Sequence, residues 1–108
     1  MPSSSVILVD SALLRQKFND GRFYERVMDG DLREDLLAER HLTRRQAGRA
    51  GQRYCTFSQS VAYYDVAGRK LAIVHQYFRN NQLGGSGRPY PKWLRLGNET
   101  FALLPVIP

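Results

Sequence analysis

Apolar and polar positions divide the chain into a helical first part and a strand-rich second part. Between residues 10 and 42, apolar side chains recur at helical spacing, as in the i,i+4 pair Leu14 and Phe18. From residue 53 onward, Tyr, Phe, Thr and Val dominate, as they do in strands. The short apolar run at 6–9 is either a first strand or an arm.

Three helices are predicted in the first part. The first follows Asp10 as its cap, and Gly21 is expected to end it in the left-handed conformation. A short second helix covers 23–28. Asp31 and Glu34 have capping-box spacing, so a third helix, with a stripe of leucines, is expected from there to about Leu42.

Residues 43–52 are interpreted as a basic, flexible connector. Thr43 and Gln46 again have capping-box spacing, but Gly48 and Gly51 weaken any helix there.

The second part predicts an antiparallel sheet. Its expected strands are 53–59, 60–66, 71–79, 94–96 and 100–104, with hairpin turns at 67–69 and 97–98. The expected fold class is therefore α+β, with N-terminal helices packed on a C-terminal antiparallel sheet of about four to five strands. We expect a single domain over 1–108, with a helical part at 10–42, the connector at 43–52, and the sheet with a Gly/Pro loop at 53–104.

Composition narrows the class of protein. The length of 108 residues suits one domain, and 43% hydrophobic residues predict a folded core. Cys55 is the sole cysteine, so no internal disulfide is possible, and it is interpreted as a small core residue. No apolar run is long enough to span a bilayer, and the first ten residues lack the features of a secretory signal. A cytoplasmic protein with no membrane partner is expected.

Charge is distributed unevenly along the chain. Residues 1–39 carry five basic and eight acidic side chains, whereas 40–97 carry eleven basic side chains and one acid, Asp65. A positive surface over the second region would attract nucleic acid or another polyanion. The alternative is that the arginines only solvate the surface of a small sheet.

A glycine-rich loop follows the strand at 71–79 and includes Gly85, Ser86 and Gly87. Its N–H groups could form a nest for a phosphate or carboxylate, with Arg79 and Arg88 adding contacts. The loop lacks the Lys-Ser/Thr ending of a P-loop, so no nucleotide cofactor is expected. It could equally be an irregular surface loop.

His75, Tyr77 and Arg79 alternate on one predicted strand face. These residue types could supply the base, the acid and the cation of a metal-free ribonuclease. The alternative is a partly buried histidine beside a core tyrosine. The other histidine, His41, is expected at a helix end, and no metal site or cofactor is predicted.

Aromatic and basic residues are mixed in the second part of the chain. Tyr90 and Trp93, beside two prolines and Lys92, are expected to be partly exposed. Single-stranded nucleic acids stack their bases on such rings within a positive groove. Since many rings must fill the core, this pattern is suggestive and unspecific.

Residues 51–94 resemble a group of small uncharacterised bacterial proteins. The shared pattern is a YYD hairpin followed by VHQY, an arginine, and a G-x-SG-x-P-x-P-K-x-L segment. The matching residues are Tyr64, Asp65, Gly68, His75, Gln76, Tyr77, Arg79, Gly84, Ser86, Gly87, Pro89, Pro91, Lys92 and Leu94. The chain departs from the pattern where residues 80–82 replace Pro-Asp-Gly and where Tyr90 replaces Asp. The resemblance implies a defined bacterial module and no particular reaction.

These observations favour a protein that binds an anionic partner such as nucleic acid. The alternatives are a metal-free ribonuclease and a protein-interaction module, such as a homodimer that buries the glycine loop. The residues expected at the binding site are Arg79, Gly85, Ser86, Gly87, Arg88, Lys92 and Trp93, and the catalytic candidates are His75, Tyr77 and Arg79.

Overall fold

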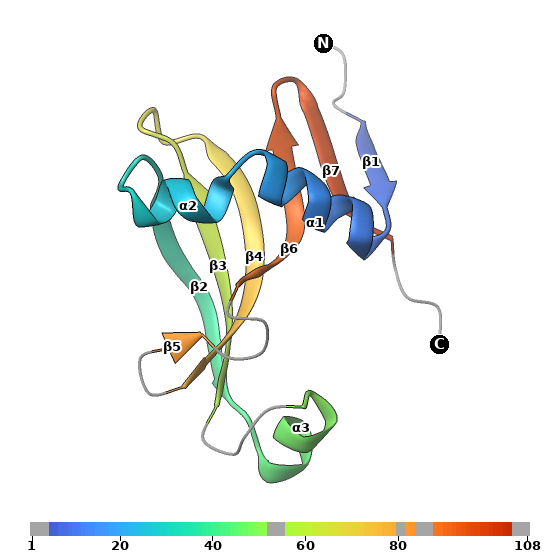
Figure 1. Ribbon diagram of the computed structural model, residues 1–108, viewed down its shortest axis with the longest axis vertical. Helices are drawn as coiled ribbons and strands as arrows, with labels where there is room; N and C mark the ends of the chain where they lie inside the picture. Colours follow the sequence, from blue (N-terminus) through green and yellow to red (C-terminus); the bar gives the residue numbers. More distant parts are fainter. Residues whose placement is uncertain (1–4, 52–55, 80–81, 84–87, 105–108) are drawn as a thin grey trace.

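The structure, a computed structural model, describes residues 5–51, 56–79, 82–83 and 88–104 (Figure 1). Its helices are α1 (Ser11–Asp20), α2 (Phe23–Met28) and α3 (Arg44–Arg49). Its strands are β1 (Val6–Val9), β2 (Arg33–His41), β3 (Phe57–Tyr64), β4 (Lys70–Arg79), β5 (Gln82–Leu83), β6 (Tyr90–Leu96) and β7 (Glu99–Leu103).

The strands form one mixed sheet in the order β1-β7-β6-β4-β3-β2, with β5 paired to β4. β1 runs parallel to β7, and the other pairs are antiparallel. The α+β class is confirmed. The expected antiparallel sheet of about four to five strands is confirmed only in part, because β1 joins in parallel and the first part of the chain contributes both β1 and β2.

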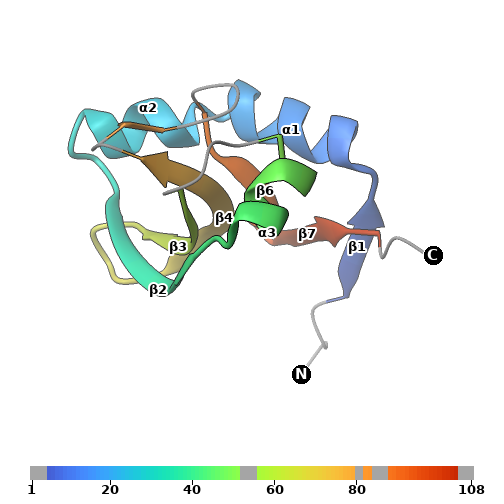
Figure 2. The same ribbon diagram turned by 90° about the horizontal axis from the view of Figure 1, so that it is seen from below.

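Helices α1 and α2 lie across one face of the sheet, in the upper half of Figure 1. Helix α3 lies at the opposite, lower end of the molecule (Figures 1 and 2). The core forms where α1 and α2 meet the sheet, and the Phe18 and Phe23 rings stack at 5.7 Å between their centroids. The most deeply buried large side chains of this core are Leu14, Phe18, Tyr63, Val74 and Leu94. The apolar pair expected at Leu14 and Phe18 is therefore confirmed as a core contact.

The third predicted helix is wrong, because residues 33–41 form β2. This strand pairs with β3 from Arg33 opposite Tyr64 to His41 opposite Phe57. Of the leucines in the expected stripe, Leu32 and Leu42 are buried just outside the strand, but Leu36 and Leu37 within it are 56% and 51% exposed. A backbone ladder with a distant strand has overridden the local helical pattern, as tertiary pairing often does. His41 consequently ends a strand and not a helix.

The connector expected at 43–52 contains helix α3. The Thr43 hydroxyl accepts a hydrogen bond from the Gln46 N–H, and the Gln46 side chain accepts one from the Thr43 N–H. Both bonds of the capping box are thus formed, and they outweigh the cost of Gly48 inside the helix. Residues 44–49 are therefore helical, although the glycines were expected to weaken a helix there.

Two smaller expectations also change. Two strands were expected over 53–66, but the described part of this range contains one continuous strand, β3. Gly21 ends α1, but with a φ of −79° it is not in the left-handed conformation. The left-handed conformation is adopted instead by the next residue, Arg22, with a φ of 54°. The hairpin turns are confirmed, with Gly68 and Gly97 at positive φ. In the described ranges, no helix is long and apolar enough to cross a membrane.

Candidate functional site

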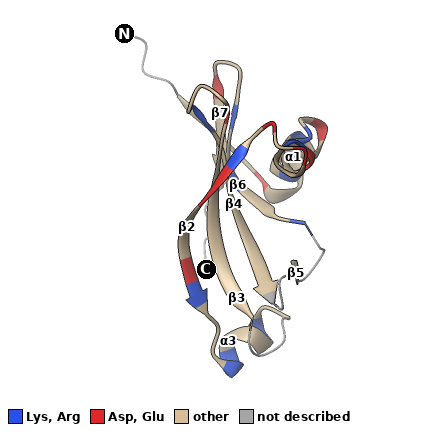
Figure 3. Ribbon diagram, turned by 90° about the vertical axis from the view of Figure 1, so that its left-hand side faces the viewer, with Lys and Arg blue, Asp and Glu red and all other residues tan. Residues whose placement is uncertain are grey.

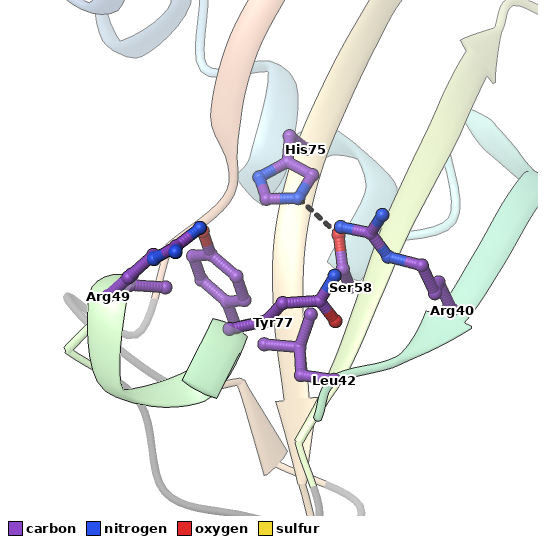
Figure 4. Close-up of a pocket in the computed structure, with 8 residues that line it drawn as sticks. Arg40, Leu42, Arg49, Ser58, His75 and Tyr77 are labelled. Atoms are coloured by element: carbon purple, nitrogen blue, oxygen red, sulfur yellow. Dashed lines mark hydrogen bonds between the residues drawn. The ribbon is translucent and has the colours of Figure 1, made fainter. Parts of the chain in front are cut away.

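Two adjoining pockets surround His75 and Tyr77 on β4, and we call them together the His75 cleft. The first has a volume of about 410 Å³ and the second about 320 Å³. Both are lined by Ala50, His75 and Tyr77, so the two rings lie where the pockets meet. Figure 4 shows the first pocket, with Arg40 and Arg49 approaching these rings from opposite sides.

The alternation of β4 brings His75 and Tyr77 into the cleft. Ala72 and Val74 pack in the core on one face of the strand, and His75 and Tyr77 lie on the other. Their rings meet edge to face, with centroids 4.8 Å apart and planes at 87°. The predicted shared face of these two residues is therefore confirmed.

Ser58 of β3 forms a hydrogen bond with His75. Its Oγ lies 2.6 Å from Nε2 of the imidazole (Figure 4). In the ladder, Ser58 stands opposite Tyr77 and Ser60 stands opposite His75, so the bond runs diagonally between the strands. A hydroxyl and an imidazole in contact are thus presented together to the first pocket.

The charged groups of the cleft share one sign. Among the described residues that line it, the charged side chains are Arg15, Arg40, Arg49 and Lys92. They come from α1, β2, α3 and β6 respectively. Figure 3 shows basic but no acidic residues on α3. The cleft therefore gathers positive potential from four separate elements.

This environment also acts on His75. Burial lowers the pKa of its imidazole below the ordinary value, and the nearby charges of Lys92 and Arg40 lower it further. These effects favour the neutral form of the ring, in which one of its nitrogens can accept a hydrogen bond.

A second aromatic ring lies beside Tyr77. The Tyr90 ring centroid is 6.4 Å from that of Tyr77, and the Arg15 guanidinium lies 5.6 Å from the Tyr90 centroid. Cationic and aromatic groups are thus interleaved along the second pocket, which suits a ligand with both charge and flat rings.

The structure brings together only some of the residues expected at the site. His75, Tyr77 and Lys92 line the cleft. Arg88 is engaged elsewhere, in an ion pair with Glu25, and the Trp93 ring lies beside the cations of Lys70 and Arg95. The loop residues Gly85, Ser86 and Gly87 and the side chain of Arg79 are outside the described part of the structure.

Sequence reasoning missed Ser58 and three of the four cations. Arg40 and Arg49 belong to the basic region at 40–97. Its charge predicted a positive surface but did not indicate which of its side chains would meet in the fold. Ser58 could have been found from the hairpin, because a turn centred between Ala67 and Gly68 pairs it with Tyr77. Nothing in the sequence indicated Arg15 as a site residue, since α1 carries both acidic and basic side chains.

Within the described ranges, no group of three or more His, Cys, Asp or Glu side chains is placed to hold a metal ion. No protein-family model, no curated protein and no solved structure matches this chain. The resemblance to small bacterial proteins therefore stays a prediction, and the inferences that follow rest on the geometry of the cleft.

Proposed function

We propose that this protein binds an anionic partner, such as nucleic acid, in the His75 cleft. The observation that carries the proposal is that each charged side chain among the described lining residues is cationic. The four cations around the cleft repel one another, and a bound anion would offset that electrostatic repulsion. A polyanion fits better than a single small anion, because the cations are spread over two adjoining pockets.

The aromatic residues of the cleft favour nucleic acid among polyanions. The Tyr77 ring lines both pockets, with Arg40 and Arg49 in the first and Arg15 and Lys92 in the second, and the Tyr90 ring lines the second. Unpaired bases stack on such rings while cations contact the phosphates. We therefore expect single strands to bind more tightly than duplex DNA of the same length.

The test is the salt dependence of binding. Labelled single-stranded RNA, single-stranded DNA and duplex DNA are titrated with protein at several salt concentrations. Each phosphate contact contributes a slope of about 0.7–0.9 in log K against log salt. The double substitution Arg40→Gln with Lys92→Gln is expected to lower the slope by about 1.4–1.8 and to weaken binding of each sequence alike.

A matched control removes the same charge elsewhere. Arg33 and Arg69 lie at the far end of β2 and of the β3–β4 hairpin, each in an exposed ion pair. The substitution Arg33→Gln with Arg69→Gln should leave the slope nearly unchanged. If both double variants lose affinity and slope equally, net charge alone determines binding. If the wild-type protein does not bind even at low salt, the proposal is refuted.

The two alternatives predict other outcomes in the same samples. A ribonuclease would cleave the RNA strand while leaving DNA intact. An interaction module would show a molecular mass that rises with protein concentration, measured by sedimentation, and no salt-dependent affinity for polyanions.

A further inference from the structure

Ser58 and His75 are placed as a nucleophile and its base. The 2.6 Å separation between Ser58 Oγ and His75 Nε2 is within the range over which an imidazole takes a proton from a hydroxyl. In the tautomer protonated at Nδ1, Nε2 accepts the bond that the hydroxyl donates. Both side chains line the first pocket, so a ligand there can reach the hydroxyl oxygen.

We propose that Ser58 attacks the phosphorus of an anionic phosphodiester and that His75 is the general base. This inference rests on the anion-binding function proposed above and adds a reaction to it. The substrate class follows from the surroundings, since a phosphodiester is the ester that carries its own negative charge into a cationic pocket. A neutral carboxylic ester would gain little from Arg40 and Arg49.

The reaction balances in two steps. As the Ser58 oxygen forms its bond to phosphorus, its proton passes to His75 Nε2 and the bond to the leaving oxygen breaks. The leaving oxygen lies on the side of phosphorus opposite Ser58, so it takes a proton from solvent and departs as an alcohol, which leaves a phosphodiester on Ser58 and a protonated His75. In the second step a water molecule attacks the same phosphorus from that opposite side and gives a proton to solvent, while the imidazolium returns its proton to the serine oxygen as that oxygen leaves.

The cations have a definite role in both steps. The five-coordinate phosphorus carries more negative charge than the starting diester, so fixed positive groups stabilise it more than the ground state. Arg40 and Arg49 flank the pair from opposite sides (Figure 4). Guanidinium groups also bind two phosphate oxygens at once, which orients the phosphorus toward the hydroxyl.

A serine nucleophile has one consequence that separates it from a ribonuclease. It does not use the 2′-hydroxyl of RNA, so it acts on DNA and on simple diesters as well. Cleavage by the 2′-hydroxyl would instead be confined to RNA and would leave cyclic phosphate ends.

The experiment uses the whole chain with bis(4-nitrophenyl) phosphate and with a single-stranded DNA oligonucleotide. Release of 4-nitrophenolate is followed by absorbance, and acid-quenched protein is digested and analysed by mass spectrometry for a phosphodiester on Ser58. We expect wild-type protein to release the product and to carry the adduct at Ser58. Ser58→Ala and His75→Gln should each lower the rate by about 100-fold or more.

Ser60→Ala is the matched control, because Ser60 stands directly opposite His75 on the same strand as Ser58. It should leave the rate within about twofold of wild type, since Ser60 is not among the described residues that line either pocket. Ser58→Ala should still bind the oligonucleotide with the wild-type salt slope, which shows that it is folded.

The outcomes separate this inference from the proposed function. Salt-dependent binding by wild-type protein with no product and no adduct would overturn the reaction and leave the binding function standing. Product that forms equally in Ser58→Ala, or only from RNA, would also overturn it. Absence of both binding and product would refute the two proposals together.

Discussion

Arg88 and Glu25, 63 positions apart in the sequence, form an ion pair that ties the segment before β6 to helix α2. Arg88 Nη2 lies 2.8 Å from Glu25 Oε2 and 3.1 Å from Oε1, and it also donates to Asn19 Oδ1. The guanidinium carbon lies 5.2 Å from the centroid of the Tyr24 ring. The arrangement gives Arg88 a structural role, so the proposed anion site does not include it.

Arg88→Met is expected to destabilise the fold by about 1 kcal/mol, because the pair is partly exposed and solvent weakens it. The hydrogen bond from Arg88 is the main cause that holds the pKa of Glu25 below its usual value. The pair therefore stabilises fully above the unfolded pKa, about 4.3, and its contribution is lost as pH falls through the folded value.

Urea unfolding at pH 7 and at pH 3 checks this prediction. Wild-type protein should lose more stability than Arg88→Met between the two pH values. Glu25→Gln should behave like Arg88→Met at pH 7. If acidification costs all three proteins the same free energy, the pair does not stabilise the fold.

The pKa of His75 should rise when the cations near it are removed. It is lowered by burial first and by Lys92 and Arg40 next, while Arg15 and Arg49 line the same cleft and Ser58 and Tyr77 contact the ring. Lys92→Met and Arg40→Met should each raise it, as should a bound polyanion. NMR titration of the His75 Cε1–H measures this directly.

The lowered pKa of His75 also makes the free energy of unfolding depend on pH. The folded pKa lies below the unfolded value of about 6.5, so the unfolded chain binds the proton first as pH falls. His75 therefore contributes fully above pH 6.5, and stability drops as pH falls from there toward the folded pKa. His75→Gln should flatten this part of the profile, and an unchanged slope would contradict the assignment.

Tyr63→Phe is expected to leave stability unchanged or to raise it by up to about 1 kcal/mol. The Tyr63 side chain is fully buried, its pKa is raised by that burial, and its hydroxyl has no hydrogen-bond partner among the described residues. Removing an unpaired buried hydroxyl removes its desolvation cost. Thermal unfolding of this variant is compared with that of Phe18→Ala, which should lose about 3–5 kcal/mol of core packing.

Gly21→Ala should destabilise the protein by about 1–3 kcal/mol through overpacking. A Cβ at this position would lie 2.5 Å from Cε2 of Phe23, a buried ring stacked on Phe18. Gly48→Ala is the matched control, because a Cβ there meets nothing within 4 Å and favours helix α3 by about 0.5–1 kcal/mol. Opposite shifts in melting temperature are expected, and equal shifts would contradict the steric account.

Part of the candidate site could be predicted because its signals are local. His75 and Tyr77 are two positions apart on a strand, so alternation alone places them on one face. Ser58, Arg15 and Arg49 come from three other elements and converge only once the chain has folded. For Arg88, its position beside a glycine-rich loop in the sequence gives no local sign of the ion pair with Glu25, which only the fold brings together.

The sequence by itself determined the elements whose causes lie within a few residues. The Asp10 cap starts α1, and glycines at positive φ close the hairpins at Gly68 and Gly97. Only the tertiary structure decided that residues 33–41 form a strand and that Arg15 and Arg49 reach the His75 cleft. The physical reason is that caps and turns are satisfied locally, whereas a β-ladder and a convergent cleft depend on partners that the fold brings from far along the chain.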